Sequence, residues 1–391
     1  MSKRYAGGIV SAVFKPLDPH GDLNPLFIVG GEGQGAMGLN LGGTVYRSSP
    51  VQIGASTDWY RGFVSGPSIR AGAIKQNGTM WVWGNSENGQ LGDNTIIARS
   101  SPVQVGALTT WSQMTIRQNT SLALKTDGSL WVWGASNFGQ LGQNNLTYRS
   151  SPVQVGTSYD WIDADGGNNT MGAIKADGTL WTWGRAQAGQ SGQNTSAPTP
   201  IERSSPVQVG ADTNWSKIKV MGNSMIAIKT DGSLWVWGYQ DQGQLGINNT
   251  IPRSSPVQVG ALTDWALITS GHYTQMAIKT NGTLWGWGRN DTNGTSIGDN
   301  TRINRSSPVQ IGSDTNWSKV AMGRHNGSAI KTTGTLWAWG AAATGGATGQ
   351  NDRVDRSSPV QIGTNTNWAW TAVGGDTEGT QFILATANTQ F

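Results

Sequence analysis

The chain has 391 residues, with 56 glycines, 20 tryptophans, no cysteine and only 13% charged side chains. Without cysteine it has no disulfide, no thiolate metal site and no cysteine nucleophile. The net charge of +4 is spread along the chain, whereas nucleic-acid binders concentrate basic residues on one face, and no run of 18 apolar residues predicts a membrane-spanning helix.

The first 25 residues precede any repeated sequence. Their apolar side chains have no core of their own to enter, so we predict an extended arm over residues 1–25 and a separate domain over residues 26–391. Such an arm is either a plain terminal tail or a segment that orders by docking on a neighbouring subunit. In the second case the anchoring side chains would be Tyr5, Ile9, Val10 and Phe14.

A six-residue string recurs through the rest of the chain. Arg-Ser-Ser-Pro-Val-Gln begins at Arg47, Arg99, Arg149, Arg203, Arg253, Arg305 and Arg356. Each copy is followed by a tryptophan, at Trp59, Trp111, Trp161, Trp215, Trp265, Trp317 and Trp368. Repetition of this kind indicates an array of similar modules, either a propeller or a solenoid.

Each module predicts four β-strands. An apolar run ending in lysine, such as Ala73-Ile74-Lys75, is followed by an Asn-Gly or Asp-Gly turn and then by Trp-x-Trp-Gly. Asn-Gly or Asp-Gly between two apolar runs is a strong hairpin signal, because both residues tolerate positive φ. The run at 130–133 is apolar on both faces, as expected for a strand between two sheets. We expect the Pro-Val-Gln-Val segment to start an outer edge strand at its proline.

The two ends of the chain predict that the modules close into a ring. Trp-x-Trp-Gly occurs six times, against seven copies of the six-residue string. The missing strand is supplied by Leu26–Gly30, and the chain stops after a predicted strand at Gln381–Leu384. We therefore predict that the last two strands pair with the first two. The expected fold is all-β, a closed seven-bladed β-propeller with four-stranded blades.

The recurring sequence also resembles that of a known family. Gly-(Thr/Ser)-Leu-Trp-x-Trp-Gly, followed by Gly-Gln-Leu-Gly and then Pro-Val, is similar to the repeat of the regulator of chromosome condensation over roughly residues 26–391. The resemblance implies a propeller that binds proteins through the faces of its disc. Family members include a nucleotide-exchange factor for a small GTPase, a plant ultraviolet photoreceptor and a bacterial β-lactamase inhibitor, so the fold alone does not select a function.

Catalytic and metal chemistry have little support in the sequence. The histidines are His20, His272 and His325, and the last two occupy near-equivalent places in their repeats, which favours a structural role. Nineteen of the 20 tryptophans fall on repeated positions, which indicates packing, and the photoreceptor's Gly-Trp-Arg-His-Thr segment is missing. We expect no enzyme activity, catalytic residue, cofactor, metal site or small-molecule substrate. We also expect the repeated arginines to bond backbone in their own loops.

A binding function should lie where the repeats differ from one another. Exposed aromatic and arginine side chains are the usual anchors of protein interfaces. The candidate interface residues on this criterion are Tyr60, Arg61, Phe63, Phe138, Tyr159, Tyr239 and Arg289.

The opening of the arm carries a second, shorter resemblance. Its Tyr-x-Gly-Gly-Ile-x-Ser-Ala sequence is similar to the openings of some virion proteins from phages of marine bacteria. We therefore expect a non-enzymatic virion component of a tail, fibre or capsid, with neighbouring virion subunits or a host surface molecule as protein partners. The alternative is a bacterial adaptor or inhibitor, cytoplasmic or secreted, that grips a protein on one face. Neither reading includes specific nucleic acid or a transmembrane segment.

Overall fold

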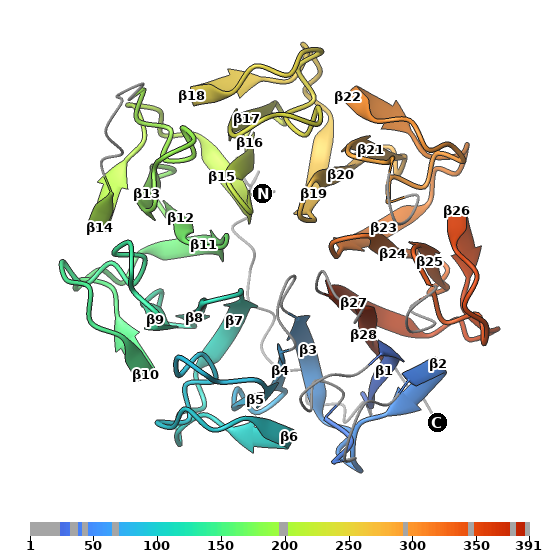
Figure 1. Ribbon diagram of the computed structural model, residues 1–391, viewed down its shortest axis with the longest axis horizontal. Coiled ribbons are helices and arrows are strands. Elements are labelled where there is room, and N and C mark those ends of the chain that lie inside the picture. The colour runs from blue at the N-terminus through green and yellow to red at the C-terminus, as the bar shows by residue number, and fades with distance from the viewer. Residues whose placement is uncertain are drawn as a thin grey trace, which may run out of the picture.

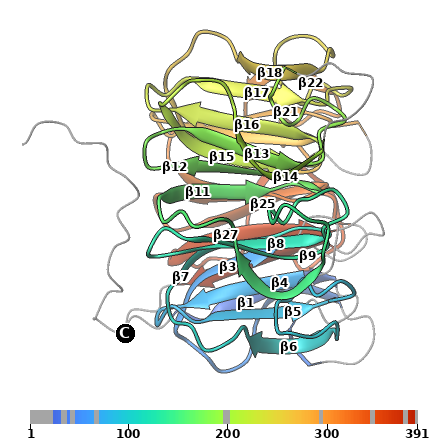
Figure 2. The ribbon, with the colours of Figure 1, turned by 90° about the vertical axis from the view of Figure 1, so that its left-hand side faces the viewer.

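The computed structural model describes residues 24–31, 38–40, 46–64, 70–194, 202–291, 296–342, 348–375 and 381–387. Within these ranges, 28 strands form seven four-stranded antiparallel sheets, which stand around a central axis (Figure 1). Figure 2 shows the same disc from its edge. None of the described residues is helical, so none of them forms a helix that could cross a membrane. The prediction of an all-β propeller with four-stranded blades is confirmed.

We letter the strands of each blade A to D from the central axis outward. The A strands are β3 (Trp59–Val64), β7 (Trp111–Ile116), β11 (Trp161–Gly166), β15 (Trp215–Met221), β19 (Trp265–Ser270), β23 (Trp317–Met322) and β27 (Trp368–Gly375). The B strands are β4 (Arg70–Lys75), β8 (Thr120–Lys125), β12 (Thr170–Lys175), β16 (Ser224–Lys229), β20 (Thr274–Lys279), β24 (Asn326–Lys331) and β28 (Gln381–Ala387).

The two remaining strands complete each blade on its outer side. The C strands are β5 (Met80–Gly84), β9 (Leu130–Gly134), β13 (Leu180–Gly184), β17 (Leu234–Gly238), β21 (Leu284–Gly288), β25 (Leu336–Gly340) and β1 (Leu26–Gly31). The D strands are β6 (Arg99–Gln104), β10 (Arg149–Gln154), β14 (Arg203–Gln208), β18 (Arg253–Gln258), β22 (Arg305–Gln310), β26 (Arg356–Gln361) and β2 (Tyr46–Gln52).

One blade is assembled from both ends of the chain. Its strands run in the order β2-β1-β28-β27, so its C and D strands come from the N-terminal part and its A and B strands from the C-terminal part. Strand β1 pairs antiparallel with β28, from Leu26 opposite Thr386 to Gly30 opposite Phe382. The predicted pairing of the two ends is confirmed. It removes the open sheet edges that an unclosed array would expose.

A ring of backbone hydrogen bonds joins each blade to the next. In each loop between a C and a D strand, an asparagine adopts positive φ, a conformation that this residue tolerates better than most. Its N–H donates to a serine carbonyl in the D strand of the following blade. The pairs are Asn40–Ser100, Asn94–Ser150, Asn144–Ser204, Asn194–Ser254, Asn248–Ser306, Asn300–Ser357 and Asn351–Ser48. The last pair, at 2.8 Å, completes the circle across the two ends of the chain.

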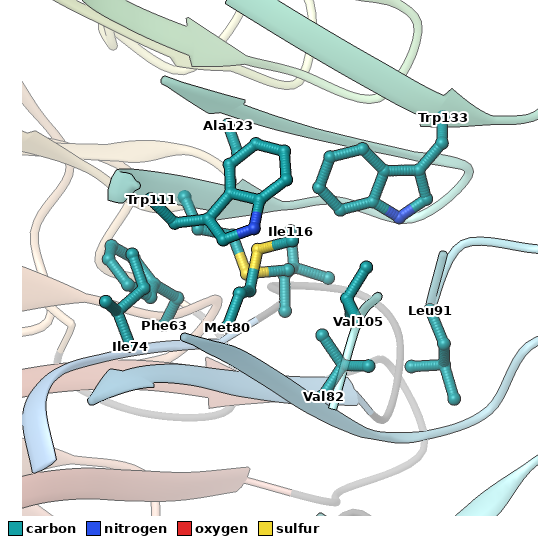
Figure 3. Close-up of a cluster of buried hydrophobic side chains, with 11 residues drawn as sticks. Phe63, Ile74, Met80, Val82, Leu91, Val105, Trp111, Ile116, Ala123 and Trp133 are labelled. Atoms are coloured by element: carbon teal, nitrogen blue, oxygen red, sulfur yellow. The ribbon is translucent and has the colours of Figure 1, made fainter. Parts of the chain in front are cut away.

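The tryptophans fill the spaces between blades. Trp133 is fully buried, and its Nε1 donates to the carbonyl of Gln90 in the preceding blade at 2.8 Å. Figure 3 shows its ring and that of Trp111 in a cluster with Met80 and Val105. A buried tryptophan removes roughly 150–250 Å² from water, which contributes up to about 4–6 kcal/mol. The second tryptophan of four further Trp-x-Trp pairs bonds likewise, at Trp183, Trp237, Trp287 and Trp339. The packing interpretation of the repeated tryptophans is supported.

Each repeated lysine is held between two tryptophans rather than presented to solvent. Lys331 Nζ lies 4.8 Å from the Trp317 ring and 3.9 Å from the Trp337 ring, and it pairs with Asp314 at 2.9 Å. The same pairing to aspartate recurs in other blades, as Lys75–Asp58, Lys175–Asp160, Lys229–Asp212 and Lys279–Asp264. These lysines are therefore part of the repeated scaffold.

Two local predictions about the six-residue string were wrong. Six of the seven D strands begin at its arginine, and β2 begins one residue earlier, so its proline lies inside the strand, next to a register irregularity such as that between Val82 and Gly84. A proline is tolerated there because the strand forms the outer edge of the sheet. The arginines bond mainly carboxylates of their own loops: Arg99 pairs with Asp93 at 2.6 Å, and Arg305 pairs with Asp299 at 2.7 Å.

Candidate functional site

The antiparallel course of the blades gives the disc two different faces. The AB face carries the turns between A and B strands and the loops between C and D strands, as the hydrogen bond from the Tyr239 N–H to the Asn223 carbonyl shows. The BC face carries the turns between B and C strands and the loops that lead to the next blade, as the bond from Trp111 N–H to the Gly78 carbonyl shows. Asn24, where the described chain begins, lies on the BC face, beside Asp58.

Aromatic and basic side chains from neighbouring blades meet on the AB face. The rings of His272 and Tyr273 stand edge to face, 4.2 Å apart. The Arg289 guanidinium lies 5.4 Å from the Tyr273 ring and pairs with Asp291 at 2.9 Å. Tyr239 is exposed, and its hydroxyl donates to Asp241 at 3.1 Å. The cluster uses residues that differ from repeat to repeat.

A second aromatic and basic pair lies on the same face, on the two blades that precede the blade of Tyr239. The half-buried ring of Phe138 has the Arg185 guanidinium 5.0 Å from its centroid. Arg185 follows a C strand, and its N–H bonds the carbonyl of Asn169 in an A–B turn, which places it on the AB face.

Burial, assisted by nearby positive charge, keeps two histidines on the AB face neutral. Burial, together with the cations Arg324 and Arg289 and the neighbouring His325, lowers the pKa of His272 to about 4. Burial and the same two arginines lower the pKa of His325 to about 4. The Arg324 Nε donates to His325 Nε2 at 3.1 Å, which requires an unprotonated acceptor nitrogen. The histidines are therefore part of a cationic cluster rather than isolated packing residues.

The A strands enclose a central channel with a volume of about 1220 Å³. Its lining runs from BC-face residues such as Gln76 and Thr213 to Arg117 and Ser270 near the AB face. A cavity of this size exceeds the usual 300–1,000 Å³ of a small-molecule pocket. The channel is therefore larger than a usual small-molecule pocket, and its lining includes residues near both faces.

Charged residues line the channel unevenly. The cations are Arg61, Arg117, Lys217, Lys219 and Lys319, and the anions are Asp163, Asp165 and Asp177. The carboxylates already serve the protein's own backbone and side chains. Asp163 accepts from the Ile218 N–H at 2.9 Å and Asp165 from the Val220 N–H at 2.9 Å, so they cover the open edge of β15. Burial raises the pKa of Asp165. The charges of Arg117 and Lys219 and the hydrogen bond from the Val220 N–H outweigh this effect, so the pKa is lowered overall.

Three of these cations form no ion pair with the part of the chain that the structure describes. Among the described residues, no ion pair or hydrogen bond is made by the Arg61 guanidinium or by the ammonium groups of Lys217 and Lys319, and Arg61 Nε is buried without a partner. Burial lowers the pKa of Arg61. Electrostatic attraction to Tyr60 and Asp163 raises this pKa again, but only in part. Burial and then repulsion from Arg61 lower the pKa of Lys319. The lumen is thus a place where an anion would be stabilised.

The candidate interface residues from the sequence do not form one surface. Phe138, Tyr239 and Arg289 lie on the AB face. Tyr159 lies on the BC face, because its carbonyl stands against the Gly128 turn.

The three candidates on β3 belong to the channel. Tyr60, Arg61 and Phe63 line the lumen, and Phe63 is only 8% exposed, so its prediction as an exposed loop anchor was wrong. The anchor residues Tyr5, Ile9, Val10 and Phe14 lie outside the described residues.

Several site residues were missed in the sequence. Lys217 and Lys319 occupy the third position of their A strands, as Arg61 does, and that shared position could have identified them. Tyr273 and Arg324 adjoin the two repeated histidines and were not singled out. Within the described part of the chain, no group of three or more histidine or acidic side chains is arranged to hold a metal ion.

Comparison with known proteins places this architecture in a family. A model described as the RCC1-like domain matches residues 25–379. The chain belongs to the RCC1-like domain family. No curated protein matches it in sequence.

Solved structures of this fold superpose over nearly the whole chain. Prp20p from Saccharomyces cerevisiae is 19% identical, with 95% of this chain and 92% of that chain covered and a TM-score of 0.80. Yeast RCC1 (Prp20) bound to Kap60 is also 19% identical, with coverage of 100% and 95% and a TM-score of 0.81. Human WBSCR16 is 18% identical, with coverage of 94% and 100% and a TM-score of 0.77. Identities this low establish a shared fold and nothing about shared partners.

We predict that the two AB-face histidines make stability depend on pH. The pKa of each histidine is about 4 in the folded chain, against the ordinary value of 6.5 expected in the unfolded chain. Between about pH 4 and 6.5 the unfolded chain therefore binds more protons than the folded chain. Stability is then fully present above about pH 6.5 and declines as the pH falls toward about 4. The midpoint of urea unfolding, measured at steps from neutral to about pH 5, should fall in the native protein. It should fall less in the variant H272Q/H325Q, and equal slopes in the two proteins would refute this assignment.

Proposed function

We propose that this RCC1-like propeller is a non-enzymatic protein-binding module whose docking surface is the AB face. The observation that carries the proposal is the cluster of Tyr239, Tyr273 and Arg289 with the paired histidines on that face. Aromatic and arginine side chains are the groups that most often dominate binding energy in protein interfaces. The fold supports a binding role, because Prp20p, which shares it, binds Gsp1p, histones and Kap60.

The contrast between the two faces supports the choice of the AB face. On the BC face, the lysine, aspartate and tryptophan group recurs from blade to blade and is engaged in internal contacts. A group that every blade needs serves the scaffold. On the AB face, Arg185 and Arg289 each lie beside a half-buried ring, that of Phe138 or Tyr273, directly after the C strands of two blades. Arg324 bonds His325 in a third blade. This excess of positive charge suits a partner with an acidic surface, since complementary charge speeds and orients association.

A virion is the setting that we propose for this module, on the strength of the short resemblance at the start of the arm. The geometry is compatible with such a role, because the described chain begins at Asn24 on the BC face, opposite the proposed docking surface. An arm that anchors the protein from the BC side leaves the AB face free to meet a partner. A bacterial adaptor or inhibitor that grips its partner through the AB face, without an anchored arm, is the second candidate.

The first test compares matched tyrosines on the two faces. We expect Tyr239→Ser to weaken binding to the natural partner by about tenfold or more, because an aromatic anchor of an interface contributes about 1.4–2 kcal/mol or above. The control, Tyr159→Ser, removes a more exposed tyrosine from the BC face and should change affinity less than about twofold. The partner is isolated from the source by cross-linking and purified, and affinities are measured by calorimetry. A larger loss for Tyr159→Ser would reject the AB face as the docking surface.

The second test separates the two settings. A variant that lacks residues 2–20 should keep the unfolding midpoint of the full chain, because the propeller is built from later residues. If the arm is an anchor, this variant should be absent from purified virus particles that contain the full-length chain, as measured by mass spectrometry. Incorporation of both forms, or of neither, would reject the anchored virion role.

A further inference from the structure

The central channel contains cations that the protein's own architecture does not use. Each A strand contributes its third residue to the lining of the lumen, and Arg61, Lys217 and Lys319 hold that place on β3, β15 and β23. These strands are not neighbours in the ring (Figure 1). The positive charge is thus distributed around the lumen rather than gathered at one point.

The carboxylates in the lumen do not neutralise these three groups. Asp163 accepts hydrogen bonds from Gln113 Nε2 at 3.2 Å and from the Ile218 N–H at 2.9 Å. Asp165 accepts from Arg117 Nη2 at 3.0 Å. Their role is to join one A strand to the next. The attraction of Asp163 for Arg61 offsets the effect of burial on the Arg61 pKa only in part.

The lumen also offers apolar contacts beside its charges. The rings of Phe63 and Trp370 lie 6.0 Å apart, and Tyr60 and Ile162 are exposed large side chains that line the same cavity. The Arg61 guanidinium lies 5.5 Å from the Phe63 ring. Cations alternating with aromatic and aliphatic surface fit a ligand that itself alternates charged and apolar groups.

We propose that the channel binds an extended acidic segment of a polypeptide, whose carboxylates pair with Arg61, Lys217 and Lys319. A small anion could contact one of these groups, whereas a chain that passes through a cavity of about 1220 Å³ can contact all of them. Its apolar side chains would pack against Phe63 and Trp370. The inference deepens the proposed binding function by naming the chemistry of the partner, and it rests on that function but not on the AB-face anchors.

The natural entrance for such a segment is the AB face. Arg117 and Ser270 line both the channel and a small adjoining pocket that includes His272 and Arg324. The basic cluster of the AB face therefore continues into the lumen. An acidic partner docked on that face would have a continuous positive path along which one of its segments can enter.

The experiment measures the binding of a fluorescein-labelled peptide of alternating glutamate and leucine by fluorescence anisotropy. The full chain should bind it, and a glutamine and leucine peptide should bind about tenfold more weakly or worse. The double variant K217M/K319M keeps the aliphatic stems and should lose about tenfold in affinity for the acidic peptide. The matched control R302M/R353M removes the same charge from exposed positions outside the lumen and should lose less than about twofold.

Three results would overturn the proposal. Equal binding of the two peptides would exclude recognition of carboxylates. Equal losses in the two double variants would assign the binding to the general surface charge. Citrate that binds the full chain as tightly as the acidic peptide would replace the polypeptide site with a site for small anions.

A second readout does not depend on any ligand. Arg61→Met removes a desolvated guanidinium that repels Lys319, so the free variant should melt at a higher temperature than the native protein while binding the acidic peptide more weakly. A lower melting temperature would make Arg61 a structural residue and would contradict its assignment as a ligand group. Loss of the natural partner in Tyr239→Ser but not in K217M/K319M would reject this inference and leave the proposed function intact.

Discussion

The pairing of β1 with β28 is the constraint on which the rest of this structure depends. Each other blade has its B and C strands joined by a short turn, whereas this blade joins them by hydrogen bonds alone, from Leu26 opposite Thr386 to Gly30 opposite Phe382. The pairing turns a linear array of modules into a ring. The ring creates the lumen, gives the disc two distinct faces and directs the described start of the chain to the BC face.

Much of this architecture was predictable because it repeats or follows from adjacent residues. The Asn-Gly and Asp-Gly turns, the tryptophans and the complementary strands at the two ends are all local signals, and each predicted element is present. At the turns, however, only the glycine takes positive φ, and the asparagine or aspartate before it does not. The carboxylate partners of Arg99 and Arg305 were predictable too, since Asp93 and Asp299 lie six residues before them. We predicted backbone partners for these arginines instead.

The functional surfaces were harder to predict, because they form only when distant strands converge. Arg61 and Lys319 are far apart in sequence, and nothing in either repeat shows that closure of the ring makes them share one lumen. Likewise, Tyr159 and Tyr239 both interrupt the repeat pattern, yet the antiparallel course of the blades sends them to opposite faces. Departure from the repeat identified unusual residues, but it did not predict which of them lie on the same surface of the disc. The AB face and the lumen nevertheless share one character, an excess of positive charge beside aromatic rings.

Closure of the ring is tested most directly by a pair of engineered cysteines. Phe27 and Ala385 face each other across β1 and β28, and the chain has no other cysteine to compete. In the variant F27C/A385C, a disulfide should form within single molecules under mild oxidation, because partners in an antiparallel pair lie within its reach. Mass spectrometry should then find the two peptides linked. Cysteines that stay reduced, or that link only different molecules, would contradict the closed ring.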